Sequence, residues 1–257
     1  NDSISLTVKD SFTYNISNSD KSKSIGGFAA NITNDGFEFA DKTVIGSACT
    51  LTVEGKAIIG ENVTVTNNGT LTSNGMITGL GKLTGSADVL IDLVKGTVSG
   101  ITFELSDTND CKAIVVSSSA TGNVTIENCT IDGWNKTTPD CGIYVNSVNS
   151  NVLISKVTFK DFSSNMLPDD LSTLPIPINV DVMNQKGKVK ISECTFDNCN
   201  RSNNVVFDAH VDATIGKDQN IDFDCDTRVC IWSSDDHNKT FSIAEGITFT
   251  NKSILTI

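Results

Sequence analysis

Two aspartates, Asp181 and Asp208, have the side-chain type and the spacing that best suit chemistry in this chain. Each lies in a segment where apolar and polar residues alternate, a pattern that gives a β-strand one inward and one outward face. Paired strands lie about 4.8 Å apart. If the two segments pair at their offset of 27 residues, we expect the two carboxylates to stack on the outward face. At that distance the pKa of one carboxyl rises, or a cation bridges the pair.

His210 follows Asp208 on the same predicted face. The three side chains could act as general acid and base in an enzyme, and the two aspartates alone could bind Ca²⁺. The alternative is a solvated acidic face, on a chain whose formal net charge is −12. Both interpretations remain open at this stage.

Three further residues are candidates for binding rather than for catalysis. Asp169 and Asp170 form a second acidic pair inside the segment 166–177, which holds three of the four prolines. Protruding loops of this kind often carry the binding surface of repeat proteins. Trp232 ends an apolar segment and would offer a surface for stacking against a sugar ring. The alternatives are a rigid spacer or an edge cover for the segment, polar corner residues for the two aspartates, and packing over the core for Trp232.

The elements that would position these residues follow from two repeats, of which the first has a period of six. From Val53 to Val89 an aliphatic residue recurs at every sixth position: Val53, Ile59, Val65, Leu71, Ile77, Leu83 and Val89. A small or slim residue comes four positions after each of the first six: Ala57, Val63, Gly69, Gly75, Gly81 and Ala87. Helices and ordinary strands do not keep this period. We expect a β-solenoid with the aliphatic residues inside, the small ones at tight corners and about 18 residues in a three-sided coil.

A longer repeat follows the hexads. An apolar residue followed by Thr-Phe or Thr-Ile recurs, with its first residue at Ile101, Cys129, Val157, Cys194 and Ile247. The steps are 28, 28, 37 and 53 residues, and the last would span two coils with a copy missing near Ile221. A second apolar strand follows each copy, at 113–116, 142–145, 178–182, 205–209 and 229–232. Constant register of this kind is typical of a parallel β-helix.

We therefore predict an all-β chain that forms a single-stranded, right-handed parallel β-helix with an N-terminal cap. The cap, or a first irregular coil, would occupy residues 1–42, and the β-helix residues 43–257. Short hexad coils would span 43–95, and wider coils 96–257, with an insertion at 166–177.

The net charge, the hydropathy and the cysteine spacing exclude several classes of partner and ligand. A net charge of −12 with only two arginines disfavours nucleic acid. No stretch approaches the ~20 apolar residues of a membrane span, so we expect no membrane insertion within this segment.

The eight cysteines do not follow a zinc pattern. Asp-Cys recurs thirty residues apart at Cys111 and Cys141, and Cys-Thr recurs at Cys129 and Cys194. This recurrence predicts cysteines in interior stacks, with disulfides between neighbouring coils as the alternative.

The segments Asn-Val-Thr-Ile-Glu-Asn-Cys-Thr-Ile (123–131) and Lys-Val-Lys-Ile-Ser-Glu-Cys-Thr-Phe-Asp-Asn (188–198) resemble right-handed parallel β-helix proteins of the pectate-lyase-like superfamily. Within it, Gly-Gly-Phe-Ala (26–29) and Phe-Ser-Ser-Asn (162–165) are similar to tetrapeptides of polymorphic outer-membrane and adhesin-like repeat proteins. The fold resemblance covers roughly residues 43–257. Lyases of the superfamily use basic residues to abstract the proton and to hold uronate carboxylates, and this chain has only two arginines.

The resemblance implies a secreted or cell-surface, adhesin-like ectodomain that is non-catalytic and either structural or binding. Its partners would be an extracellular glycan or a host or cell-surface protein, and it would need no cofactor, with calcium as the one candidate ion. The competing hypothesis is a polysaccharide-active glycoside hydrolase or lyase that uses Asp181, Asp208 and His210.

Overall fold

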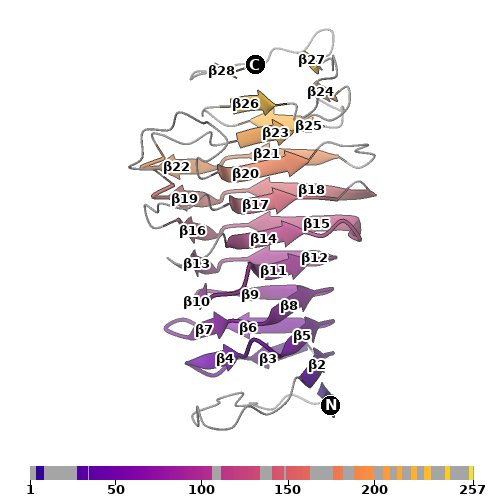
Figure 1. Cartoon of the computed structure of the whole chain (residues 1–257), viewed down its shortest axis with the longest axis vertical. Coiled ribbons are helices and arrows are strands. Elements are labelled where there is room, and N and C mark those ends of the chain that lie inside the picture. The colour runs from indigo at the N-terminus through magenta and orange to yellow at the C-terminus, as the bar shows by residue number, and fades with distance from the viewer. Residues whose placement is uncertain are drawn as a thin grey trace.

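The computed structural model describes residues 4–8, 28–33, 35–105, 111–133, 141–147, 149–162, 176–181, 188–199, 205–208, 213–215, 221–224, 229–232, 241–243 and 255–256. Over these ranges the chain forms strands and no helix, and the paired strands run parallel. They stack in three sheets around one core, so the chain climbs as a right-handed parallel β-helix (Figure 1). The predicted β-helix is confirmed.

Each regular coil contributes one strand to each of three sheets, A, B and C. Sheet A has eleven strands within the described ranges: β1 (Ile4–Val8), β2 (Phe28–Ile32), β5 (Thr50–Val53), β8 (Thr70–Ser73), β11 (Val89–Leu93), β14 (Lys112–Val116), β17 (Cys141–Val145), β20 (Ile176–Asp181), β23 (Val205–Asp208), β26 (Val229–Trp232) and β28 (Leu255–Thr256). Sheet B has ten: β3 (Asp35–Glu38), β6 (Lys56–Ile59), β9 (Met76–Gly79), β12 (Gly96–Ser99), β15 (Thr121–Glu127), β18 (Asn149–Ser155), β21 (Val189–Ser192), β25 (Ile221–Asp224), β24 (Ala213–Ile215) and β27 (Phe241–Ile243). Sheet C has seven: β4 (Thr43–Ile45), β7 (Thr64–Asn67), β10 (Lys82–Thr84), β13 (Thr102–Glu104), β16 (Thr130–Asp132), β19 (Thr158–Lys160) and β22 (Thr195–Asp197).

The hexad residues do line the core, but the predicted coil of about 18 residues is wrong for most of the hexad region. Leu51 pairs with Leu71, a step of 20 residues, and a step of 18 occurs between Val65 and Leu83. The corners account for the difference, because the corner between β6 and β7 has four residues (60–63), whereas the equivalent corner between β9 and β10 has two (80–81).

Val89 departs from the predicted inward pattern. The hexad residues from Val53 to Leu83 are at most 1 % exposed, whereas Val89 is half-buried. Its neighbours Leu90 and Ile91 are both fully buried and take its place in the core. The period of six therefore fails at Val89, the first residue of β11, and the strand enters the core one residue later, at Leu90.

Three of the six predicted corner residues lie where the backbones of successive coils are in close contact. A Cβ added to Gly69, Gly75 or Gly81 would lie 2.1–2.4 Å from a carbonyl oxygen of the preceding coil. Ala57 was predicted at a corner but lies on the inner face of β6, fully buried and paired with Ile77.

The wider coils follow the predicted second repeat. Phe103, Ile131, Phe159 and Phe196 form one continuous column on the inner face of sheet C. The rings of Phe159 and Phe196 stack with centroids 5.2 Å apart. The described parts of the segments predicted as second strands all lie in sheet A, whereas residues 182 and 209 are outside the described residues. The prediction that a degenerate copy of this repeat lies near Ile221 is wrong. Ile221 pairs with Val189 in sheet B and does not extend sheet C.

Most of the described cysteines are buried, and one of the two predicted recurrences keeps its register. Cys129 and Cys194 hold equivalent positions just before the sheet C strands, with Val157 between them. Cys111 and Cys141 are not partners, since Cys141 pairs with Lys112 at a step of 29 rather than 30. Cys111 and Cys129 are at most 1 % exposed.

The sheets extend into the segment predicted as a cap or first irregular coil. β2 pairs with β5 in sheet A, and β3 pairs with β6 in sheet B. The register of β3 shifts between Asp35 and Phe37, so this coil is irregular. The predicted insertion at 166–177 overlaps β20, which begins at Ile176; residues 163–175 lie outside the described residues.

Candidate functional site

The structure aligns three of the predicted site residues on one ladder position of sheet A. Asp181 pairs with Asp208, as the sequence predicted, and Asp208 pairs in turn with Trp232. These statements concern the backbone register, since the side chains of the three residues lie outside the described part. His210, Asp169 and Asp170 lie wholly outside the described residues.

Metal binding finds no support in the described part of the chain, where no three His, Cys, Asp or Glu side chains gather closely enough to hold an ion. The predicted calcium site at Asp181 and Asp208 therefore remains a prediction.

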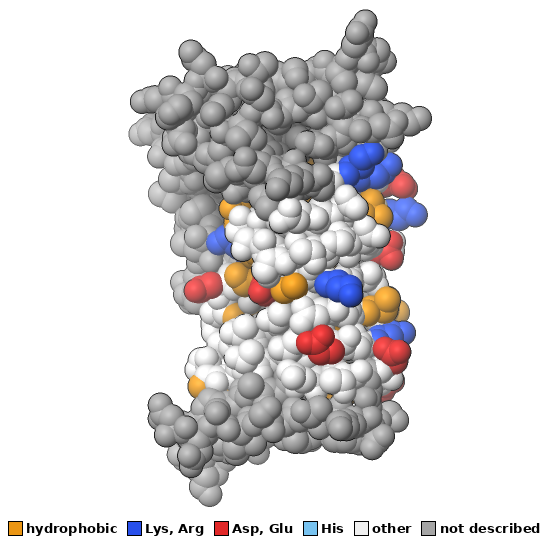
Figure 2. Space-filling view, turned by 90° about the vertical axis from the view of Figure 1, so that its right-hand side faces the viewer, with side chains coloured by type: hydrophobic (Ala, Val, Ile, Leu, Met, Phe, Trp, Pro, Cys, Tyr) orange, Lys and Arg blue, Asp and Glu red, His pale blue; other side chains and the backbone are white. Residues whose placement is uncertain are grey.

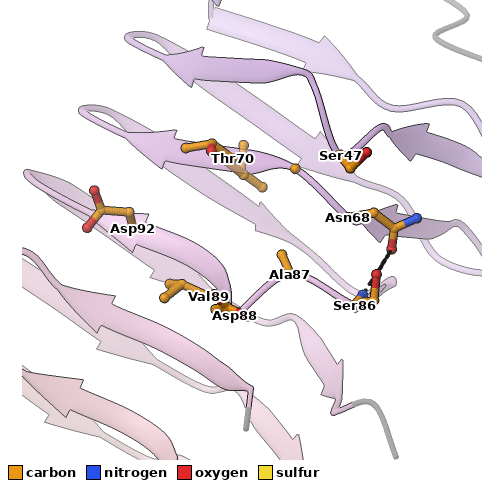
Figure 3. A pocket seen from close by; sticks show the side chains of 10 residues that line it. Ser47, Asn68, Thr70, Ser86, Ala87, Asp88, Val89 and Asp92 are labelled. Carbon is orange, nitrogen blue, oxygen red and sulfur yellow. Dashed lines mark hydrogen bonds between the residues drawn. The ribbon is translucent and has the colours of Figure 1, made fainter. Parts of the chain in front are cut away.

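A concave site that the sequence reasoning missed lies where the hexads end. A surface depression of about 430 Å³ opens at the corner between sheets C and A (Figure 3). Corner segments of three successive coils and the first residues of β8 and β11 surround it. Its lining comprises Ser47, Asn68, Gly69, Thr70, Leu71, Ser86, Ala87, Asp88, Val89 and Asp92.

The depression forms because β11 parts from β8 over its first residues. β5 and β8 pair along their whole length, from Thr50 and Thr70 onward. β8 and β11 pair only over their last two residues, where Asp92 meets Thr72. The start of β11 instead pairs with β14 on its other side. The separation leaves Val89 half-buried at the wall of the depression.

Two neighbouring asparagines hold the corner beside this opening. Asn67 is fully buried, and its Nδ2 donates to Leu90 O at 2.9 Å while its Oδ1 accepts from Gly69 N at 3.0 Å. Asn68 is half-buried. Its Oδ1 accepts from both the backbone N and the Oγ of Ser86, each at 2.9 Å (Figure 3). The position of the Asn68 amide is therefore fixed before any ligand arrives.

The charge of the lining is negative. Asp88 is exposed and Asp92 is half-buried, and the lining contains no Lys, Arg or His. Burial raises the pKa of the Asp92 carboxyl above its usual value, and a hydrogen bond with Ser117 opposes this rise. The arrangement offers hydroxyl, amide and carboxylate groups but neither a nucleophile activated by a base nor a cation.

A second surface feature is a flat polar face on the outside of sheet C. One outward column, which we call the threonine column, consists of Thr64, Lys82, Thr102, Thr130, Thr158 and Thr195, paired strand by strand. Thr195 is exposed, and the other four threonines are half-buried. They are held flat because the residue after each one packs into the core, as Phe103 and Phe159 do.

The column beside it is charged in the wider coils. It runs through Thr66, Thr84, Glu104, Asp132, Lys160 and Asp197. Lys82 bridges the two columns by an ion pair with Glu104 at 2.5 Å. The hydrogen bond and the charge of Glu104 raise the pKa of Lys82. On the face shown in Figure 2, uncharged groups cover most of the described surface, and charged side chains of both signs gather toward one edge.

The chain was compared with family models, curated proteins and solved structures, and none gives a significant match. The parallel β-helix therefore stands on the structure itself. Among the described residues there is no helix of the length and apolarity that crossing a bilayer would require.

Proposed function

We propose that this chain is a secreted or cell-surface, adhesin-like β-helix ectodomain that binds an extracellular glycan or protein and catalyses no reaction. The threonine column is the observation that carries this proposal. From Thr102 to Thr195, four consecutive coils present a hydroxyl at the same position, at the strand spacing of about 4.8 Å. Each hydroxyl can donate and accept hydrogen bonds.

Rigidity makes such a surface suitable for recognition. β-branched threonine side chains have few rotamers to lose, and their backbone is fixed in the ladder, so ordering on binding costs little. A flat repeated surface fits an extended partner, such as a polysaccharide or the edge of another protein, better than it fits a single small substrate. The resemblance to adhesin-like repeats of the pectate-lyase-like superfamily agrees with this interpretation.

Binding of the full chain to a glycan array and to immobilised extracellular-matrix proteins tests the proposal. Thr130→Lys places a long cation in the middle of the column, and we expect it to weaken binding at least tenfold. Thr125→Lys is the matched control, because Thr125 is a half-buried threonine like Thr130 but lies on β15 in sheet B. Absence of any ligand, or equal loss with both variants, would contradict the proposal.

A polysaccharide-active enzyme is the second candidate, favoured by the pairing of Asp181 with Asp208. The strand spacing of about 4.8 Å is close to the ~5–5.5 Å between the two carboxyl groups of retaining glycosidases. Incubation with a polysaccharide panel separates the two candidates. Turnover that Asp208→Asn abolishes would establish the enzyme, whereas ligand binding without turnover supports the adhesin.

A further inference from the structure

We propose that the depression between β8 and β11 is a binding site for a neutral saccharide, with Asn68 and Asp92 as its principal polar contacts. The inference rests on the proposed function, because it names a ligand class and a place for glycan recognition. It is separate from the threonine column, which lies on the outer face of sheet C.

The size and shape of the depression suit a sugar. Its volume of about 430 Å³ falls in the range of roughly 300–1,000 Å³ that is usual for small-molecule sites. The opening exists because β11 leaves the ladder, so the space is part of the backbone geometry and does not depend on a single rotamer. One or two pyranose rings would occupy a space of this size.

The polar groups of the lining match the hydroxyls of a saccharide. Ser86 binds Oδ1 of Asn68 with two hydrogen bonds, which leaves Nδ2 as the hydrogen-bonding group that Asn68 can offer to a ligand. Within the described residues this Nδ2 has no acceptor of its own. Asp88 and Asp92 accept from sugar hydroxyls, and a carboxylate forms stronger hydrogen bonds than a neutral acceptor. Donor and acceptors on different strands would fix the orientation of a ring.

An apolar strip completes the lining. Val89 is half-buried and adjoins Ala87, which is 7 % exposed. Both side chains line the depression and can pack against the C–H face of a pyranose. Exposure of Val89 is the direct consequence of the break in the hexad pattern.

The charge of the lining determines which sugars fit. Two carboxylates and no basic side chain, on a chain of net charge −12, repel uronates and sulfated sugars. The ligand class is therefore neutral, unlike the anionic polysaccharides that a lyase with basic residues would hold.

Saturation-transfer NMR with the full chain and named sugars tests the inference. The neutral probes are glucose, galactose, mannose, N-acetylglucosamine and lactose, and the acidic probes are glucuronate and galacturonate, all in buffer containing a calcium chelator. We expect at least one neutral probe to bind and neither acidic probe to do so. Asn68→Ala and Asp92→Asn should each weaken the binding at least tenfold.

Two further variants separate loss of contact from loss of structure. Asn68→Asp keeps the acceptor for Ser86 and removes only the Nδ2 donor, so we expect a loss similar to that of Asn68→Ala. Asn123→Ala, at an exposed asparagine on β15, should bind as the wild type does. The inference is overturned if no neutral probe binds, if acidic probes bind equally well, if binding requires Ca²⁺, or if Asn68→Asp binds normally. In each of those cases array binding that is sensitive to Thr130→Lys would leave the proposed function intact.

Discussion

Replacing Gly75 by alanine tests how closely successive coils are packed at the corners. Met76 N donates to Gly55 O at 2.8 Å and so fixes this corner against the coil before it. A Cβ on residue 75 would lie 2.1 Å from that same oxygen and 2.7 Å from Glu54 O. Gly60→Ala is a matched control, because the nearest atom to its added Cβ is Val63 Cγ2 at 3.5 Å.

The expected change in the free energy of unfolding follows from the contact between the new Cβ and Gly55 O. The distance to Gly55 O has to lengthen from 2.1 Å to at least 3.0 Å, which means moving backbone that is tied into two sheets. Overpacking of this kind costs about 1–3 kcal/mol or more. Replacing glycine by alanine at an unstrained position stabilises by about 0.4–1 kcal/mol through the unfolded chain. We therefore expect Gly75→Ala to lower the free energy of unfolding by about 1–3 kcal/mol and Gly60→Ala to leave it equal or raise it slightly.

Urea unfolding followed by circular dichroism gives the global effect, and amide hydrogen exchange at Met76 gives the local one. Exchange at Met76 should accelerate in Gly75→Ala and stay unchanged in Gly60→Ala. If the two variants unfold within about 0.5 kcal/mol of each other, the usual scatter of surface substitutions, the close approach of the coils is refuted.

Three other substitutions probe the core, the corner below the depression and a buried thiol. Phe159 is fully buried and stacks on Phe196, so Phe159→Ala should lower the free energy of unfolding in urea by about 3–5 kcal/mol; a loss below about 1 kcal/mol would contradict the packing. Asn67→Ala leaves Leu90 O and Gly69 N without their partners and should cost about 1–3 kcal/mol in the same assay, whereas a neutral effect would mean that the corner does not depend on these bonds. Burial raises the pKa of the Cys129 thiol from 9.0 to about 12. Between these two pH values the folded chain keeps a proton that the unfolded chain has lost, so the free energy of unfolding falls as the pH rises. Cys129→Val, which copies Val157 one coil later, should show a smaller loss of stability between about pH 8 and pH 10; an equal loss would show that Cys129 does not cause it.

The strand pairing was predictable because alternation within strands fixes the register between them. Asp181 could be aligned with Asp208 from the sequence alone, since a shift by one residue would expose Val180 and bury a carboxylate. The steps of 28 and 37 residues between Ile101, Cys129, Val157 and Cys194 were visible for the same reason.

Coil length and the depression could not be predicted in this way. The hexads specify which residues are buried along the chain, but the coil length depends on corners such as 60–63 and 80–81, whose different lengths leave the hexad pattern unbroken. At β11 three aliphatic residues, Val89, Leu90 and Ile91, follow one another, so two inward registers were compatible with the pattern. Packing against β14 selects the register that leaves Val89 at the surface, and that choice involves residues more than twenty positions away.

Recovery of the retained ligand tests the central functional claim most directly. The immobilised full chain is incubated with a mixture of polysaccharides of known length and with extracellular-matrix proteins, and the retained and released fractions are analysed by mass spectrometry. We predict that at least one component is retained and recovered at its original length and without chemical change. Shortened or unsaturated saccharides, or no retained component at all, would contradict a non-catalytic recognition ectodomain.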